Sequence, residues 1–350
     1  MKIVLFFVSV LSACAAFAAG DVCRELMKRA AACDEAADAA VAAIRTPEEL
    51  AEKQKEWRTT WLESLGGMLE RTPLKDRTTG VIQCDGYRIE KVVFQSQPGV
   101  YVTALLYLPA TPKFRAPYPG LLIAHGHSNE GKLRDGYRRM AILAVKAGFG
   151  VFAPDPISQG ERWQCAAKYD TKENCSTEHS SLGARAWLVG WNFARFRLWD
   201  AVRSVDYMES RKELDLSKLA VAGNSGGGTM SAYLQAFDER VKVACPNCYV
   251  SSLREVIRER GCHDAEQFFQ GQLKNGFNHA ALVALGQPRV DLLIGARHAD
   301  YFPIAGVRST FGILQGLHDR LGASNDVGLY SCDGPHGWAE SSRQAALAWL

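Results

Sequence analysis

The sequence LAVAGNSGGGTM, residues 219–230, decides how the rest of the chain is interpreted. Its first four residues form an apolar run typical of a buried strand, and a helical pattern follows from Thr229 to Phe237. The turn between them matches Gly-x-Ser-x-Gly around Ser225, a pattern that can raise a serine above a sheet. Five-residue patterns also occur by chance, and an ordinary glycine-rich turn fits this stretch as well. Ser225 is therefore a candidate nucleophile only if the chain supplies its partners.

The composition is that of a globular protein. The chain has 350 residues, 47% of them hydrophobic, which allows either one large core or one core with a small appendage. Its 41 basic and 38 acidic residues are spread along the sequence and give a formal charge of +3. Because no basic block could form a phosphate-binding stripe, no nucleic-acid partner is expected.

Residues 1–19 are predicted to form an export signal of bacterial type. A lysine at position 2 precedes an apolar run, and small residues end the segment. The run is shorter than the roughly 20 residues that span a bilayer. Cleavage after Ala18 or Ala19 competes with lipidation of Cys14 in a lipobox-like Leu-Ser-Ala-Cys sequence. Cleavage is favoured because the segment before Cys14 is short, so membrane attachment is expected only if Cys14 is lipidated.

The ten cysteines fit an oxidising compartment. Cys165 and Cys175 lie in one polar loop and are the pair most expected to form a disulfide. Cys245 and Cys248 have CxxC spacing, but no second such pair accompanies them, so the favoured interpretation is that they are small buried residues or partners of other cysteines. The sequence leaves other pairings and the oligomeric state open.

The remaining pattern predicts an α/β fold. Residues 20–80 are expected to form a helical lead-in, and residues 81–350 the main domain, with a helical insertion at about 247–289. Alternating segments predict an antiparallel hairpin, and continuous apolar runs predict a mostly parallel sheet with helices on both faces. The hairpin is expected at 87–94 and 100–108, the parallel strands at 121–124, 151–154, 219–222, 241–244, 290–294 and 327–330, and helices at 137–147, 191–208, 229–237 and 304–321.

A serine hydroxyl needs a base, and the base needs an orienting acid. For a turn of this kind the expected chain order is serine, acid, histidine. His336 follows the last predicted strand, and Asp300 lies in the loop after the penultimate one. Asp291 falls within that strand and should point elsewhere, while Asp333 is the reserve acid. The sequence therefore predicts Ser225, His336 and Asp300 as a catalytic triad.

Two backbone N–H groups are expected to stabilise an oxyanion, each contributing about 3 kcal/mol. Gly226, after the serine, supplies one, and His127, in the early loop His125-Gly126-His127, supplies the other. His125 and His127 could form half of a zinc site, but no third ligand at suitable spacing is evident. Neither a metal nor an organic cofactor is expected.

These residues resemble the α/β-hydrolase superfamily, and more closely its acetyl xylan esterase and cephalosporin C deacetylase-like branch. The resemblance runs from about Pro73 to the end of the chain and implies the same triad and oxyanion donors. It also implies a serine esterase acting on acetylated carbohydrate or another small O-acyl ester. The matching motifs are HGHSNEGK (125–132), DPISQGER (155–162), GNSGGGT (223–229), DAEQ (264–267), DYFPIAG (300–306) and PHGW (335–338).

Several matching residues have two interpretations. Arg162 follows a central strand and could contact substrate, but an internal salt bridge that holds its loop is favoured. Glu178 and His179 could line the entrance of the site, but a solvated loop is favoured.

Two other functions stay open. A peptidase of the prolyl oligopeptidase type would need a gating propeller, which the helical lead-in cannot supply. A non-catalytic glycan-binding protein would retain only the fold, against which the complete triad argues.

Overall fold

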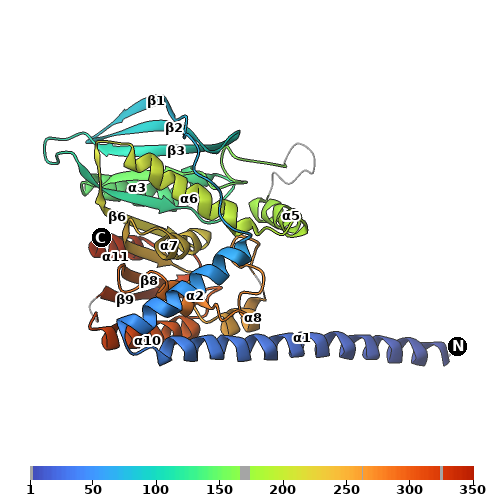
Figure 1. Ribbon diagram of the computed structural model, residues 1–350. Coiled ribbons are helices and arrows are strands. Elements are labelled where there is room, and N and C mark those ends of the chain that lie inside the picture. Colours follow the sequence, from blue (N-terminus) through green and yellow to red (C-terminus); the bar gives the residue numbers. More distant parts are fainter. Residues whose placement is uncertain (1–2, 166–173, 262, 324–325) are drawn as a thin grey trace.

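The computed structural model describes residues 3–165, 174–261, 263–323 and 326–350, which fold around a nine-stranded sheet (Figure 1). The strand order is β1-β2-β3-β5-β4-β6-β7-β8-β9. In chain order the elements are α1 (Ile3–Ala43), α2 (Pro47–Leu65), β1 (Arg77–Cys84), β2 (Tyr87–Gln97), β3 (Val100–Pro109), β4 (Tyr118–Ala124), the 3-10 helix η1 (Gly131–Leu133), α3 (Asp135–Lys146), β5 (Gly150–Pro154), α5 (Cys175–Leu188), α6 (Phe193–Glu209), β6 (Leu214–Asn224), α7 (Gly226–Phe237), β7 (Val241–Asn247), α8 (Leu253–Arg260), α9 (His279–Ala284), β8 (Asp291–Ala299), α10 (Ile304–Leu321), β9 (Val327–Pro335) and α11 (Glu340–Trp349).

The strand directions confirm the expected mixed sheet. β1, β2 and β3 are antiparallel, β3 pairs antiparallel with β5, and the pairs from β5 to β9 are parallel. β4 lies between β5 and β6, so the chain crosses to opposite sides of β4 in succession. In open α/β sheets such a reversal leaves a crevice at the carboxyl ends of the strands, where ligands bind. Ser225 directly follows β6 at this position.

Helices cover both faces of the sheet, as the sequence predicts. On one face, α3 and α11 contact each other and pack with the sheet in one buried apolar cluster. On the other, α6, α7 and α10 belong to a second and larger cluster, with α2 packed outside them (Figure 1). This second cluster makes the main core continuous with the N-terminal helices.

The N-terminal helices follow from local signals and differ in extent from the expected lead-in. Thr46 accepts a hydrogen bond from the Glu49 N–H at 3.3 Å, which caps α2. The ring of Trp61 packs 5.5 Å from that of Tyr233 on α7, which fixes α2 to the core. The expected helical segment 20–80 ends at Leu65, however, and residues 77–84 form β1. No residue of this edge strand is buried, so its sequence lacks the alternation of apolar and polar residues that reveals a strand.

The expected export signal falls largely outside what the structure describes. Residues 1–2 are not described, and of residues 3–19 only their place in α1 is, so export and the fate of Cys14 remain predictions. Within the described part of the chain, no helix is both long and apolar enough to cross a membrane.

The expected disulfide between Cys165 and Cys175 is wrong: both residues are free thiols in the structure. The Cys165 sulfur lies 3.4 Å from the Arg185 guanidinium, whereas Cys175 is buried at the start of α5. Nearness in the sequence therefore does not bring the two sulfur atoms together. Cys245 and Cys248 are buried and free, in agreement with the favoured interpretation.

The contact between α7 and the sheet is tight enough to test by substitution. A Cβ at Gly227 would collide with the carbonyl oxygen of Ala124 at the end of β4. We expect Gly227→Ala to lower the free energy of unfolding by about 1–3 kcal/mol, the usual cost of overpacking, as measured by chemical denaturation. Gly312→Ala is the matched control, because a Cβ added at Gly312 in α10 would meet no atom within 4 Å. This control should stabilise the protein by about 0.5–1 kcal/mol, and equal effects of the two changes would contradict the account.

Candidate active site

Ser225 occupies a strained turn between β6 and α7. Its backbone has φ 60° and ψ −124°, and a positive φ is uncommon for any residue other than glycine. The turn is held from outside, because the Ser225 N–H donates to the Asn247 carbonyl oxygen at 2.9 Å. Strain of this kind is typical of a serine raised above the sheet end as a nucleophile.

The glycines around Ser225 are required by close approaches. A Cβ at Gly223 would collide with the carbonyl oxygen of Ala124, the same atom that excludes a side chain at Gly227. A Cβ at Gly226 would collide with the Glu266 carboxylate. The two glycines of the Gly-x-Ser-x-Gly pattern therefore reflect packing of the turn against β4, and the additional glycine at 226 reflects packing against the loop that carries Glu266.

His336 and Asp300 meet as the sequence predicts. His336 Nδ1 lies 2.8 Å from Asp300 Oδ1, and only 1% of the Asp300 side chain is exposed. Asp300 Oδ1 also accepts the Phe302 N–H at 3.0 Å. Burial opposes ionisation of this carboxyl, but hydrogen bonds and the neighbouring imidazole outweigh it and hold the pKa of Asp300 below its ordinary value. An ionised Asp300 accepts a hydrogen bond from the Nδ1–H group and leaves Nε2 of His336 as the basic nitrogen.

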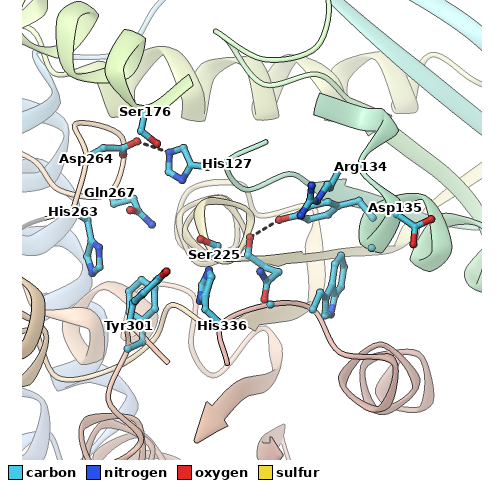
Figure 2. A pocket seen from close by; sticks show the side chains of 16 residues that line it. His127, Arg134, Asp135, Ser176, Ser225, His263, Asp264, Gln267, Tyr301 and His336 are labelled. Carbon is cyan, nitrogen blue, oxygen red and sulfur yellow. Dashed lines mark hydrogen bonds and ion pairs between the residues drawn. The ribbon is translucent and has the colours of Figure 1, made fainter. Parts of the chain in front are cut away.

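Ser225 and His336 line the same pocket, which has a volume of about 720 Å³ (Figure 2). The wall also includes His263 from the predicted insertion and Tyr301, whose ring lies 4.8 Å from that of His336. Neither His263 nor Tyr301 receives a role from the sequence alone. Tyr301 follows Asp300 directly, so the signal that finds the acid also finds this aromatic wall.

The early loop around Gly126 is held against the serine turn. The Gly126 N–H donates to the Tyr137 hydroxyl at 2.8 Å, and that hydroxyl donates to the Asn224 carbonyl oxygen at 2.8 Å. Tyr137 therefore links the loop to the residue before Ser225. This linkage brings His127 to the N-terminal end of α7, where the first N–H groups, including that of Gly226, have no partner within the helix.

The two histidines of this loop have different surroundings. Burial, assisted by the positive charges of Arg197 and Lys132, lowers the pKa of His125 to about 3, and its ring packs 4.6 Å from that of Tyr137. His125 is therefore a neutral structural residue.

The imidazole of His127, in contrast, contacts the Asp264 carboxylate (Figure 2). Burial alone would lower the pKa of His127, but the charges of Asp264 and Glu266 raise it to about 9. His127 Nε2 also lies 3.1 Å from His179 Nδ1. The solvated loop expected for Glu178 and His179 is wrong, because both side chains are fully buried in α5.

The positions of Arg162 and Asp333 place both side chains away from the proposed triad. The Arg162 side chain is 2% exposed and forms an ion pair with Asp200 at 2.7 Å, so it does not contact the pocket. It also donates to the Tyr101 carbonyl oxygen at 2.8 Å. The structure thus gives Arg162 the internal role instead of the substrate contact. The reserve acid Asp333 is 95% exposed and pairs with His298 at 2.6 Å, away from His336.

Known hydrolases and esterases are similar to this chain in sequence and in structure, although no family model matches it. The Bacillus subtilis protein YtaP, assigned as a hydrolase, is 22% identical over 272 residues, which cover 75% of this chain and 86% of that protein. A solved structure from Bacteroides fragilis, assigned as an acetyl xylan esterase, is 19% identical with a TM-score of 0.67, covering 83% of this chain and 77% of that one. A solved structure of a methylesterase is 21% identical with a TM-score of 0.70, and the match covers 90% of this chain and 67% of that one.

These likenesses establish the fold of the chain. It has the α/β-hydrolase fold, and the expected resemblance to acetyl xylan esterases is confirmed at the level of architecture. Identities of this size do not carry a substrate across, so the chemistry depends on the site itself.

The choice between the two candidate acids can be tested without knowing the substrate. We expect Asp300→Asn to slow labelling of the protein by a fluorophosphonate by about 10⁴-fold, because an amide no longer holds the imidazole as a base. Asp333→Asn is the matched control and should label at the wild-type rate, because Asp333 contacts His298 instead of His336. Similar losses in both variants, or a loss in Asp333→Asn alone, would overturn the assignment of Asp300.

Proposed function

We propose that this protein is a serine carboxylic ester hydrolase that acts through an acyl-enzyme on Ser225. The observation that carries the proposal is the strained Ser225 turn opening into the pocket that His336, paired with Asp300, also lines. A serine on such a turn, a histidine with a buried acid and two nearby backbone N–H groups are the components of acyl transfer.

The reaction follows from these positions. His336 Nε2 takes the Ser225 hydroxyl proton while Oγ attacks the ester carbonyl carbon. The oxyanion that forms is stabilised by the N–H groups of Gly226 and His127. His336 then gives the proton to the departing alcohol oxygen, which leaves the acyl group on Ser225. Water, deprotonated by His336, attacks this new ester and releases the acid, and the proton returns to Ser225.

The substrate class we propose is a carbohydrate ester, with acetyl as the acyl group. Support comes from the fold similarity to a protein assigned as an acetyl xylan esterase and from the polar wall of the pocket, which includes Arg134, Asp135 and Gln267. The similar methylesterase raises a second candidate, in which the small group is on the alcohol side of the ester. The acyl group that stays on Ser225 is the small acetyl group in the first candidate and the larger, sugar-derived part of the substrate in the second.

The two other functions are less well supported. A gated peptidase would need a propeller, and the segment before β1 within the described residues contains α1 and α2. A glycan-binding protein without activity would have no need for the strained Ser225 backbone or for the buried Asp300 beside His336.

A screen of wild type and Ser225→Ala should decide the activity. We expect wild type to hydrolyse acetylated sugars faster than methyl uronates, longer acyl esters or dipeptidyl substrates, and we expect Ser225→Ala to lose about 10⁶-fold in kcat. Ser331→Ala is a suitable control serine on β9, and it should retain the wild-type rate. Equal acetyl esterase rates in wild type and Ser225→Ala would contradict the proposal, and faster dipeptide hydrolysis would favour the peptidase.

We also propose that the protein is exported in bacteria, since the first 19 residues have the order of charge, apolar run and small residues that export signals share. The intact mass of the exported protein should correspond to a chain that begins after Ala18 or Ala19. A chain that begins with a lipid-modified Cys14 would instead indicate membrane anchoring, and a full-length mass in the cytoplasmic fraction would contradict export.

A further inference from the structure

Four side chains outside the triad converge beside the proposed oxyanion site. They are His127 after β4, His179 in α5, and Asp264 and Glu266 in the predicted insertion, and each offers a ligand atom within 4.8 Å of the others. His127 Nε2 lies 3.1 Å from His179 Nδ1 and 3.4 Å from Glu266 Oε1. His179 Nδ1 lies 2.9 Å from Asp264 Oδ2 and 3.5 Å from Glu266 Oε2.

We propose that these four residues bind a divalent cation of the Zn²⁺ type. A tetrahedral zinc ion lies about 2.0–2.2 Å from nitrogen and carboxylate ligands, which places neighbouring ligand atoms about 3.3–3.5 Å apart. The four separations of 2.9–3.5 Å given above are close to this spacing. The contact between His127 Nε2 and Asp264 Oδ2 is shorter, so these two atoms must move apart to admit the ion. Two imidazoles and two carboxylates also favour zinc over magnesium or calcium, which prefer oxygen ligands alone.

The orientation of His179 supports a cation between the four residues. Its Nε2 lies 3.0 Å from the Ile157 carbonyl oxygen, and this nitrogen must donate because a carbonyl can only accept. The other ring nitrogen, Nδ1, faces Asp264 Oδ2 and His127 Nε2, which is the side on which an ion would be bound. A histidine that donates one ring N–H to a backbone carbonyl and offers the other nitrogen to a metal is the common arrangement in metal sites.

Glu266 supplies a second and independent observation. Its side chain is 0% exposed, and among the described residues Oε1 has no hydrogen-bond partner. Oε2 is held by the Arg197 guanidinium, so Oε1 is directed toward His127. The nearby His127 imidazole approaches this oxygen at 3.4 Å without a hydrogen bond, and a metal ion between the two would give the buried oxygen a direct partner.

The outer contacts of the cluster hold its carboxylates in place. Arg197 donates to Glu266 and to the His125 carbonyl oxygen, and the Glu266 N–H donates to Asp264 Oδ1 at 3.2 Å. Carboxylate ligands in metal sites are usually held by such outer hydrogen bonds.

The site would act on the proposed esterase reaction through charge and position. Glu266 Oε1 lies where a side chain at Gly226 would be, so its negative charge is beside the residue whose N–H group is proposed to bind the oxyanion. A divalent cation bound by both carboxylates would make the charge beside Gly226 more positive. Ligation of the His127 imidazole would also fix its backbone N–H, which makes His127 a positioning residue. This consequence rests on the proposed function, whereas metal binding does not.

Metal binding is best measured in Ser225→Ala, so that the result does not depend on esterase activity. The variant is stripped with a chelator, loaded with Zn²⁺, desalted and analysed for metal by mass spectrometry. We expect one zinc ion per chain, and an affinity at least about 100-fold weaker when His179→Gln or Asp264→Asn is added. His298→Gln, at an exposed histidine on β8, is the matched control and should bind zinc like its parent.

Cobalt gives a second readout, which identifies one ligand by its spectrum. In Ser225→Ala carrying His127→Cys, bound Co²⁺ should show the near-ultraviolet charge-transfer band of a thiolate ligand, and His298→Cys should not. No zinc binding by Ser225→Ala, or equal binding after His179→Gln and Asp264→Asn, would overturn the proposal, the latter pointing to thiols elsewhere. An inactive wild-type protein that still binds one zinc ion would reject the esterase function and leave the metal site intact.

Discussion

The carbonyl oxygen at the end of β4 is the point on which the site is built. Ala124 is the last residue of β4, and its oxygen approaches Gly223 before the serine and Gly227 after it. Because neither position tolerates a Cβ, β6 can turn sharply into α7 only with glycine two residues before and two residues after Ser225. The same strand continues into the loop that ends at His127. One close backbone contact therefore sets the distance between the serine turn and the loop proposed to supply an oxyanion donor.

The rest of the site is brought to this contact by loops at the carboxyl ends of parallel strands. Asp300 follows β8, His336 follows β9 and His127 follows β4, and the parallel order of these strands places all three loops at one edge. Burial of Asp300 and partial exposure of His336 then divide their roles. The acid is ionised and held away from solvent, while the imidazole is open to the pocket.

The sequence predicts a site residue well when that residue directly follows a recognisable strand, and poorly when its role depends on contacts between distant segments. Ser225, Asp300 and His336 each directly follow a strand that the apolar pattern reveals, so a convergent topology was enough to group them. The predicted pairing of Cys165 with Cys175 failed because sequence nearness does not determine which way a sulfur atom points. His179 and His127 are separated by 52 residues, and His179 and Asp264 by 85, so no spacing rule could join them. The DAEQ motif suggests no role by itself, and only the folded chain shows that Asp264 and Glu266 approach His127.

The central claim is that an acyl group passes through Ser225. The most direct measurement is rapid acid quenching of the enzyme during turnover of a chromogenic acetyl ester, followed by peptide mass spectrometry. The account predicts a burst of chromogenic alcohol approaching one equivalent per chain and the mass of one acetyl group on the peptide that contains Ser225. Turnover without any covalent adduct, or an acetyl group confined to another residue, would contradict it.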